Sequence, residues 1–490
     1  MKSIKTLGEL RKSGYQPKTI KDELRTNLVK KLKAKEKIFE GIIGFEDTVI
    51  PDIERAILSR HNILLLGLRG QAKTRIARLL VNLMDEYIPV VQGSELNDDP
   101  MHPISRFAQD LIAEKGDDTP VGWLHREERY VEKLATPDVS VADLIGDVDP
   151  IKAATQKLTY SDERVIHFGL VPRSHRSIFV INELPDLQAR IQVSLFNILQ
   201  EGDIQIRGFK LRLPLDIQFL FTANPEDYTN RGSIITPLKD RIESQILTHY
   251  PKTIDIARQI TQQEALLAKE QKEMVVVPEL LQILLEKIAF KARESEFIDE
   301  KSGVSARLSI SGYENLVSTA ERRALINGDK KTNARVIDFW GVVPAITGKV
   351  ELVYEGEQEG PYMVAIALMN LAIKESFLTH FQDPDKLRKG QEKDPYGTIK
   401  AWFAGGNSIE LLNDSSDKEF HQTLDEVAGL RKLVESTLNV KGEEAYIYME
   451  LVLHGLAEFN VINKDIMESS FSFRDLLSNM LDDDLFDDFD

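Results

Sequence analysis

An octapeptide at positions 67 to 74 combines two glycines with a Lys-Thr pair, between an apolar run at 63 to 66 and a segment of helical spacing. Phosphate oxygens are bound where several backbone N–H groups converge at a helix N-terminus, and glycines let the backbone approach them closely. We expect Lys73 to neutralise the β and γ phosphates and Thr74 to offer its hydroxyl to Mg²⁺. The candidate phosphate-binding residues are Gly67, Leu68, Arg69, Gly70, Gln71, Ala72, Lys73 and Thr74.

One position of this loop departs from the usual pattern. The residue before the lysine is normally glycine, and here it is Ala72. A methyl group is the smallest side-chain intrusion, and it should be tolerated if the backbone φ is negative, at some cost in phosphate affinity. The alternative for the whole segment is a glycine turn that happens to precede a helix.

A second apolar run, 177 to 181, ends in Asn182 and Glu183. Phosphate-loop ATPases need a carboxylate here for the Mg²⁺ shell and often a glutamate that activates water. Glu183 is the candidate general base. Asn182 contributes an amide oxygen without charge, which predicts a weaker metal shell. Two interpretations follow: a working ATPase, or a nucleotide-binding switch with very slow turnover.

The composition narrows the function classes. The chain has 490 residues, no cysteine, and 79 acidic against 62 basic residues, for a net charge of -17. Disulfides and thiolate zinc sites are excluded, and polyanions such as nucleic acid are disfavoured partners. We find no apolar run near the roughly 18 residues that cross a bilayer and no secretory signal, so we expect a cytoplasmic protein.

The chain separates into five parts by pattern. Short apolar runs alternating with helical segments predict a parallel sheet between helices, with strands near 63–66, 89–91, 178–181, 217–221 and 245–247. Helical spacing dominates after residue 251, and a Gly- and Glu-rich stretch at 354–361 indicates a further boundary. The predicted parts are an N-terminal helical segment (1–37), an α/β nucleotide-binding domain (38–250), a helical lid (251–345), a helical extension (346–465) and an acidic tail (466–490).

Two segments leave their roles open. Basic residues between 18 and 37 accompany Leu24, Leu28 and Leu32, which predicts a helix whose leucines dock on the body, or a basic patch for an acidic partner. The acidic tail mixes charges with large apolar residues and cannot form a core, so we expect disorder. It would serve as a docking peptide or as a solubilising end.

With these residues in hand, the chain resembles AAA+ ATPases of the magnesium-chelatase I-subunit and MoxR-type branch over residues 38 to 345. The resemblance rests on the loop, on the Asn182-Glu183 strand, and on segments 42–46, 140–147 and 167–176. It implies an α/β P-loop AAA+ core followed by a helical lid, with Ile43 and Gly44 bordering an adenine pocket. It also implies a hairpin insert around 200–213.

Three more residues take roles from this resemblance. Asn224, shortly after the predicted strand at 217–221, matches the polar sensor that orients the attacking water; an ordinary Asn-Pro turn is the alternative. Arg241 matches the arginine that completes the next subunit's site, and Arg307 the second sensor of the lid. For both arginines the alternative is a surface ion pair.

The resemblance further implies an ATP- and Mg²⁺-dependent ATPase that forms a homo-oligomeric, hexameric ring. It also implies that the ring remodels or matures a partner protein, as a chaperone does. A partner with a von Willebrand factor A domain is implied by analogy only. A nucleotide-gated scaffold without hydrolysis and, less favoured by the charge, a nucleic-acid motor are the alternatives.

The weakened metal shell leads to a prediction. Asn182→Asp restores a carboxylate, so it should raise ATP turnover or lower the Mg²⁺ concentration required. Steady-state phosphate release at varied Mg²⁺ measures both, and an unchanged rate and Mg²⁺ dependence would contradict the weakened shell.

Overall fold

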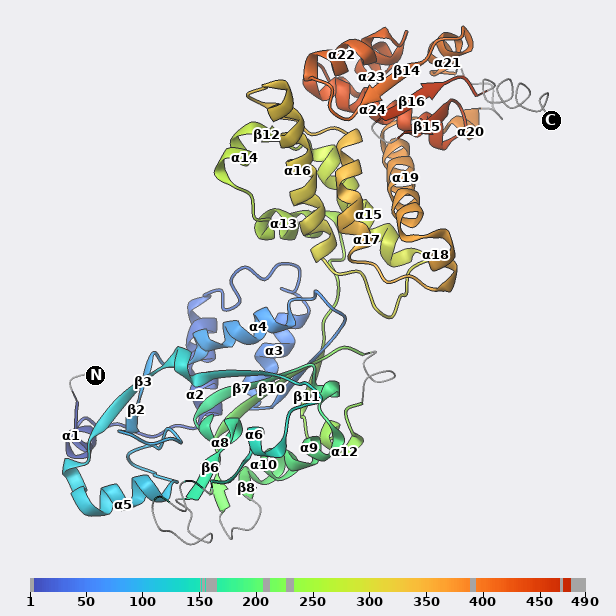
Figure 1. The fold of residues 1–490 in the computed structure, drawn as a ribbon. Helices are drawn as coiled ribbons and strands as arrows, with labels where there is room; N and C mark the ends of the chain where they lie inside the picture. Colours follow the sequence, from blue (N-terminus) through green and yellow to red (C-terminus); the bar gives the residue numbers. More distant parts are fainter. Residues whose placement is uncertain are drawn as a thin grey trace. The chain divides into compact units, whose positions relative to one another are not determined.

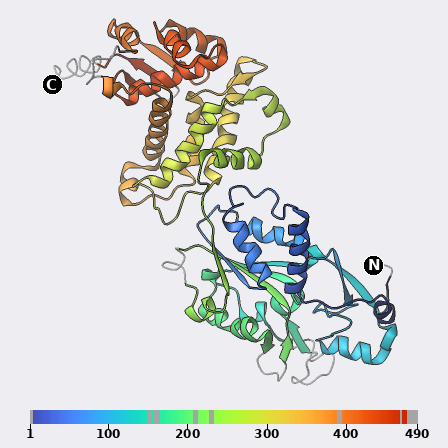
Figure 2. The same cartoon turned by 180° about the vertical axis from the view of Figure 1, so that it is seen from behind.

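The computed structural model describes residues 4–149, 151, 155, 165–205, 212–225, 233–387, 394–467 and 470–476. The chain divides into two compact units, Met1–Tyr250 and Pro251–Asp490, which are considered one at a time (Figures 1 and 2). The predicted segment 1–37 lies within the first unit, and the predicted lid and extension both lie within the second.

The first unit is built on a five-stranded parallel sheet in the order β11-β1-β10-β7-β4. Both faces of this sheet are covered by helices, so its central strands are buried and mostly apolar. All residues of β7 and β10 are buried. The strands are β1 (Ile63–Leu66), β4 (Tyr130–Leu134), β7 (Ser177–Asn182), β10 (Ile217–Ala223) and β11 (Ser244–Leu247).

Alternate strand residues face two separate cores. On one face, Ile178 and Val180 of β7 pack in a cluster with the helices α2 (Ile20–Ala34), α3 (Val49–Leu58) and α4 (Lys73–Leu79). On the other face, Phe179 and Ile181 join a second cluster beneath shorter helices (Figure 1). Those helices are α6 (Val141–Leu144), α8 (Leu170–Arg173), α9 (Ala189–Ser194), α10 (Phe196–Glu201) and α12 (Thr236–Lys239).

The N-terminal helix α2 docks on the body through its apolar face. Leu24 and Leu28 are buried in the first of these cores, whereas Leu32 is 38% exposed. Beside them, buried Glu23 forms a two-pronged ion pair with buried Arg129, at 2.8 and 2.7 Å. An unpartnered charge at this depth would be strongly destabilising, so α2 is part of the first unit's core.

One predicted strand lies outside the main sheet, and one strand of that sheet was not predicted. The run at 89–91 belongs to β2 (Tyr87–Val91), which pairs antiparallel with β3 (Val121–His125) outside the main sheet. The fifth strand of the main sheet is β4, which carries Glu132 and Lys133 among its residues. It is an edge strand. The sequence pattern did not predict it, because buried parallel strands are expected to be continuously apolar and β4 contains two charged residues.

The predicted hairpin is confirmed in its paired part. β8 (Asp203–Gln205) pairs antiparallel with β9 (Arg212–Pro214), and the turn between them lies outside the described residues. The remaining elements of the first unit are α1 (Leu7–Lys12), α5 (Arg106–Lys115), β5 (Gly146–Val148), β6 (Ile166–Phe168) and the 3₁₀ turns η1 (Leu80–Leu83), η2 (Gly116–Asp118), η3 (Arg126–Arg129) and η5 (Leu184–Asp186).

The second unit begins with helices, as predicted. Its first part holds α13 (Ile254–Glu264), α14 (Lys269–Met274), α15 (Glu279–Glu294), α16 (Arg307–Asn327), η6 (Ile337–Val342) and α17 (Val343–Thr347), with the short parallel pair β12 (Val275–Val276) and β13 (Thr332–Asn333). The Gly- and Glu-rich stretch then forms α18 (Tyr354–Glu359) and starts α19 (Pro361–His380). One hydrophobic cluster runs from Val275 to Phe473, so the predicted boundary at 345/346 lies inside one core.

The extension contains a small sheet besides its helices. Its helices are α20 (Pro384–Leu387), α21 (Gly397–Ala404), α22 (Asp417–Glu426), α23 (Leu430–Leu438) and α24 (Glu443–Glu458). The strands β14 (Ile409–Leu412), β15 (Asn463–Ile466) and β16 (Ser470–Arg474) form an antiparallel sheet in the order β14-β16-β15. Phe471 and Phe473 are buried, so residues 470–474 of the segment predicted to be a disordered tail are ordered by their aromatic side chains.

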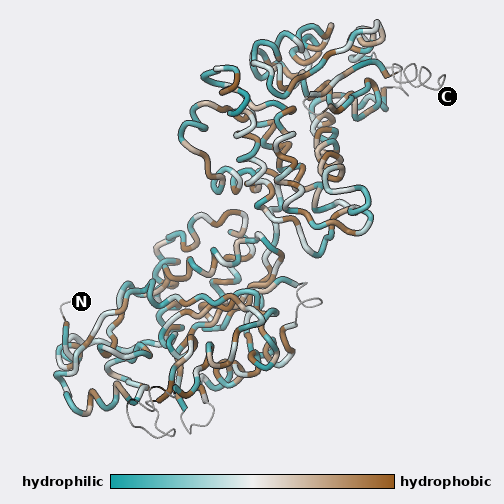
Figure 3. Tube along the Cα trace, viewed as in Figure 1, coloured by the Kyte–Doolittle hydropathy of each residue, from teal (hydrophilic) through white to brown (hydrophobic). Residues whose placement is uncertain are grey.

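Helix α19 is longer and more apolar than the sequence pattern suggested. It has 20 residues with a mean hydropathy of 1.3, which is enough by length and composition to cross a membrane. Half of this window is buried inside the protein, where α19 packs in the common core with α15 and α24 (Figure 3). The buried half of α19 therefore packs as a core helix of the second unit.

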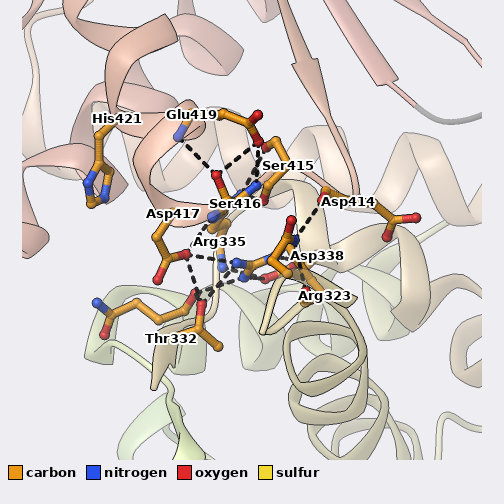
Figure 4. A network of polar contacts seen from close by, with 12 residues as sticks. Arg323, Thr332, Arg335, Asp338, Asp414, Ser415, Ser416, Asp417, Glu419 and His421 are labelled. Carbon is orange, nitrogen blue, oxygen red and sulfur yellow. Dashed lines mark hydrogen bonds and ion pairs between the residues drawn. The ribbon is translucent and has the colours of Figure 1, made fainter. Parts of the chain in front are cut away.

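A buried ion network joins the two parts of the second unit (Figure 4). Arg323 of α16 donates to Asp338 at 2.9 Å and to Asp417, the first residue of α22, also at 2.9 Å. Arg335 donates to Asp417 as well. Because both guanidinium groups are buried, losing Asp417 would leave two charges without full compensation, so α22 is held to the helices around residues 307–347.

A buried carboxyl in this unit gives a pH prediction. Burial raises the pKa of Glu450 from 4.5 to about 7, although its oxygens accept hydrogen bonds from the backbone of Val336 and Ile337 at 2.7 Å. Between these pH values the folded chain keeps a proton that the unfolded chain has lost. The free energy of unfolding should therefore fall as pH rises from 4.5 to 7, by at most about 1.4 kcal/mol per pH unit from this group.

Glu450→Gln should remove that contribution. Urea unfolding between pH 5 and 8 should show a flatter pH dependence for Glu450→Gln than for the wild type. The exposed Glu444→Gln on the same helix is the control and should follow the wild type. Parallel curves for wild type and Glu450→Gln would contradict the raised pKa.

Candidate functional site

The predicted phosphate loop leaves the carboxyl end of β1 and runs into α4. Gly67 donates its N–H to the carbonyl of Ala223 at the end of β10, 3.1 Å away, and Thr248, after β11, donates to Leu66 at 2.8 Å. A Cβ at Gly67 would lie 2.0 Å from Thr248 Oγ1 and 2.2 Å from Gln71 Oε1. Close packing therefore requires glycine at position 67. The start of the loop is held in place by hydrogen bonds to the end of β10 and to the segment that follows β11.

Two residues of the loop have left-handed backbone conformations. Gly70 has φ +75°, which glycine adopts readily. Ala72, the residue that caps α4, has φ +56° and ψ +14°. The condition for tolerating a methyl group, a negative φ at Ala72, is therefore not met, and the residue carries a strain of about 1–2 kcal/mol.

The side chain of Lys73 is buried and lies along the loop. Its ammonium group donates to the carbonyls of Gly67 and Leu68, the latter at 2.9 Å, and to Asn224 Oδ1 at 2.8 Å. Asn224 follows β10, so this bond joins the loop to the next strand of the sheet. The structure thus brings the predicted lysine and the predicted sensor into direct contact.

Glu183 continues the same chain of contacts. Asn224 Nδ2 donates to Glu183 Oε2 at 3.2 Å, so the amide bridges the ammonium and the carboxylate. Glu183 follows β7 with φ +53°, and its N–H donates to Thr222 Oγ1 at 3.2 Å. Lysine, amide and carboxylate therefore gather at one edge of the sheet, where the carboxyl ends of β1, β10 and β7 meet.

Asn182 lies at the end of β7 with its amide group fixed on both sides. Its Oδ1 accepts a hydrogen bond from Thr222 at 3.1 Å, and its Nδ2 donates to Glu132 Oε1 at 2.6 Å. Glu132 comes from β4, the neighbouring edge strand, and also accepts from Arg78 of α4. The neutral residue at 182 thus lies beside a carboxylate from another strand.

Several residues of this site escaped the sequence reasoning. Thr248 donates to Gln71 Oε1 at 2.6 Å, and the hydroxyl of Tyr250 donates to the carbonyl of Arg69 at 3.0 Å. Both residues follow directly after the predicted strand at 245–247, and that position at a strand end was the available signal. Thr222 and Glu132 lie inside strands, and only their polar character could have indicated them.

The segment predicted to border the adenine pocket packs near the end of β11. Gly44 has φ +84° and donates its N–H to Glu46 Oε2 at 2.7 Å, directly after Ile43. The ring of Phe45 meets His249 edge-on, with centroids 4.9 Å apart. Ile43 and Gly44 therefore directly precede Phe45, which contacts His249. The neighbours of His249, Thr248 and Tyr250, are hydrogen-bonded to the phosphate loop.

The two predicted arginines lie in different units. Arg241 follows α12, where it donates to Gln200 Oε1 at 3.1 Å and to the carbonyl of Pro237 at 2.7 Å, with its guanidinium 4.8 Å from the ring centre of Phe196. These bonds hold it against α10 rather than against its own loop. Arg307 is the exposed first residue of α16 in the second unit.

The oxygen donors at this edge suit Mg²⁺. The candidates are the hydroxyl of Thr74 in the first turn of α4, the amide of Asn182, and the carboxylates of Glu183 and Glu132 that contact Asn224 and Asn182. In the described part of the chain no three His, Cys, Asp or Glu side chains are grouped to hold a metal by themselves. Mg²⁺ usually keeps several waters and binds through one or two protein oxygens together with substrate phosphates, so a sparse oxygen set fits it.

The strain at Ala72 gives a stability prediction. Ala72→Gly should raise the free energy of unfolding by about 0.5–1 kcal/mol, since the relieved strain exceeds the entropy that glycine adds to the unfolded chain. Ala113→Gly, an exposed site within α5, should lower it by about 0.5–1 kcal/mol. Urea unfolding measures both, and the same sign for both variants would contradict the left-handed conformation.

No protein-family model matches the chain. Solved structures show partial likeness. NtrX from Brucella abortus is 15% identical, covering 81% of this chain and 72% of its own, with a TM-score of 0.37. RuvB of Thermotoga maritima is 10% identical, covering 74% of this chain and 83% of its own, with a TM-score of 0.36. A chain in a complex of the BchI and BchD subunits of magnesium chelatase is 19% identical, covering 66% of this chain and 98% of its own, with a TM-score of 0.33.

These scores are low, and the fold is assigned from the chain's own topology. A buried parallel sheet lies between helices, and its strand β1 leads through a glycine loop and Lys73-Thr74 into α4. The first unit therefore has the predicted P-loop fold of AAA+ cores, followed by a largely helical second unit.

Proposed function

We propose that this chain is an ATPase of the AAA+ class, related to the magnesium-chelatase and MoxR-type branch, that binds ATP and Mg²⁺ at the loop 67–74. The observation that carries the proposal is the hydrogen-bonded series Lys73, Asn224 and Glu183 at the carboxyl edge of the sheet. These are the three residue types that phosphoryl transfer to water needs: a cation, a polar orienting group and a base.

Each residue has a distinct part in the proposed reaction. The N–H groups at the start of α4 and the Lys73 ammonium would bind the β and γ phosphates. Bound Mg²⁺ would neutralise phosphate charge, and Thr74 with Asn182 would hold it. Asn224 would orient the attacking water, and Glu183, 3.2 Å from the Asn224 amide, would accept its proton.

The site is proposed to be completed by a second copy of the chain. Arg241 is held against α10 by Gln200 and Phe196. These contacts direct its guanidinium group to α10 and not to the phosphate loop of its own subunit. A guanidinium fork suits spreading phosphoryl charge, so we assign Arg241 to a neighbouring subunit's site and Arg307 to sensing the γ phosphate. A hexameric ring in the cytoplasm that remodels a partner protein is the arrangement we propose.

A second candidate function is a nucleotide-gated scaffold. It is favoured by Asn182, which lacks the charge expected of the metal shell, and by the strain at Ala72. Such a chain would bind ATP and change conformation without releasing phosphate at a useful rate. Phosphate release therefore separates the two candidates.

The experiment combines calorimetry of ATP binding with phosphate release. Lys73→Ala should weaken ATP binding by about 100-fold, because it removes a buried charge worth roughly 3 kcal/mol to a phosphate. Glu183→Gln should bind ATP within about threefold of the wild type while losing about 10²–10⁴ in phosphate release. Binding by the wild type without measurable release would select the scaffold.

Two exposed neighbours on α5 provide matched controls. Lys115→Ala and Glu114→Gln repeat the same substitutions away from the loop and should leave binding and release unchanged. If well-folded wild-type protein takes up neither ATP nor ADP with Mg²⁺ present, the proposed function is wrong.

A further inference from the structure

A carboxylate that the sequence did not single out lies beside the residue that breaks the expected pattern. Glu132 is on β4, which pairs with β7 so that Glu132 lies opposite Val180 and Leu134 lies opposite Asn182. Side chains of paired residues in a parallel sheet point to the same face, and Val180 faces the core that α4 covers. Glu132 therefore lies on the face of the sheet where the loop helix packs.

Three donors from three elements hold the Glu132 carboxylate. Asn182 Nδ2 donates to it at 2.6 Å, Arg78 donates at 3.0 and 3.3 Å, and the hydroxyl of Tyr130 donates at 3.2 Å. Its side chain is 22% exposed, so the carboxylate is sheltered but within reach of water. The group is therefore fixed in position beside the site.

The contact with Arg78 relates Glu132 to the proposed metal ligand. Thr74 and Arg78 are four residues apart on α4, so their side chains are neighbours on one face of the helix. Arg78 contacts Glu132, and Asn182 contacts it from the other strand. The carboxylate thus lies between Arg78 of α4 and Asn182 at the end of β7, where its charge would serve the metal's outer shell.

The same contacts explain why residue 182 carries no charge. The Asn182 amide donates to Glu132, and this leaves its oxygen facing Thr222. An aspartate at 182 would bring a second carboxylate against Glu132, and two adjacent carboxylates repel and resist joint ionisation. This neighbour reverses the expectation drawn from the sequence: while Glu132 is present, Asn182→Asp alone should not improve the site.

We propose that Glu132 and Asn182 act as one unit, in which Glu132 supplies from β4 the negative charge that a carboxylate at 182 would supply from β7. Glu132 is then a positioning residue for the hydrated Mg²⁺ of bound nucleotide, acting through Asn182 and ordered water. This inference rests on the proposed function, because it concerns the same nucleotide site.

The test measures the affinity for ADP by calorimetry on the full chain, in EDTA and over a series of Mg²⁺ concentrations. Glu132→Gln should raise the Mg²⁺ concentration that gives half of the affinity gain by about 10-fold or more, the usual effect of losing an outer-shell partner. Binding in EDTA should stay within about twofold. The exposed Glu127→Gln, a few residues earlier, is the matched control and should not differ from the wild type.

The decisive experiment moves the carboxylate from position 132 to position 182. Asn182→Asp alone should not lower the Mg²⁺ requirement, because the two carboxylates oppose each other. The double variant Glu132→Gln with Asn182→Asp should return the requirement to within about threefold of the wild type. A double variant that merely adds the losses of the two single variants would overturn the proposal.

A structural role for the Arg78 ion pair is tested separately. Arg78→Gln removes the pair but keeps Glu132, so it should leave the Mg²⁺ requirement near the wild-type value. If Arg78→Gln reproduces the effect of Glu132→Gln, the carboxylate only anchors α4 and the inference is wrong. If the wild type binds ADP but Glu132→Gln shows no shift, only the inference fails; if the wild type binds no nucleotide in either condition, the proposed function fails with it.

Discussion

A buried ammonium group is the constraint on which the first unit depends. Lys73 is 7% exposed, and a cation at that depth is tolerated only where oxygen acceptors surround it. The carbonyls of Gly67 and Leu68 and the amide of Asn224 meet this need, but only if β1 and β10 are adjacent and in register. The adjacency of β1 and β10, and through Asn224 the position of Glu183, are thus tied to this one charge.

Much of the site could be predicted from the sequence because its residues directly follow apolar strands. The loop after 63–66, Glu183 after β7 and Asn224 after β10 occupy such positions, and the structure brings them together. The backbone angle at Ala72 could not be predicted, since it depends on how the loop closes onto α4. Glu132 was missed because β4 is an edge strand whose charged residues disguise it.

The second unit shows a different limit of sequence patterns. The Gly- and Glu-rich stretch around 354–361 has the composition of a linker, yet it forms α18 and the start of α19. Composition describes local chain preference, whereas the ion network of Arg323, Arg335 and Asp417 and the shared core arise between segments distant in sequence. Long-range contacts of this kind leave little trace in a local window.

The place of β16 in its sheet has a consequence for biosynthesis. β16 is the middle strand, hydrogen-bonded to β14 on one side and β15 on the other, although it comes last of the three in the chain. On the ribosome, β14 and β15 therefore emerge with no partner between them, and their backbone groups stay exposed until residues 470–474 leave the exit tunnel. The first unit can complete its core much earlier, so the chain is expected to pass through a stage in which a finished N-terminal unit carries an unfinished C-terminal sheet that chaperones can bind.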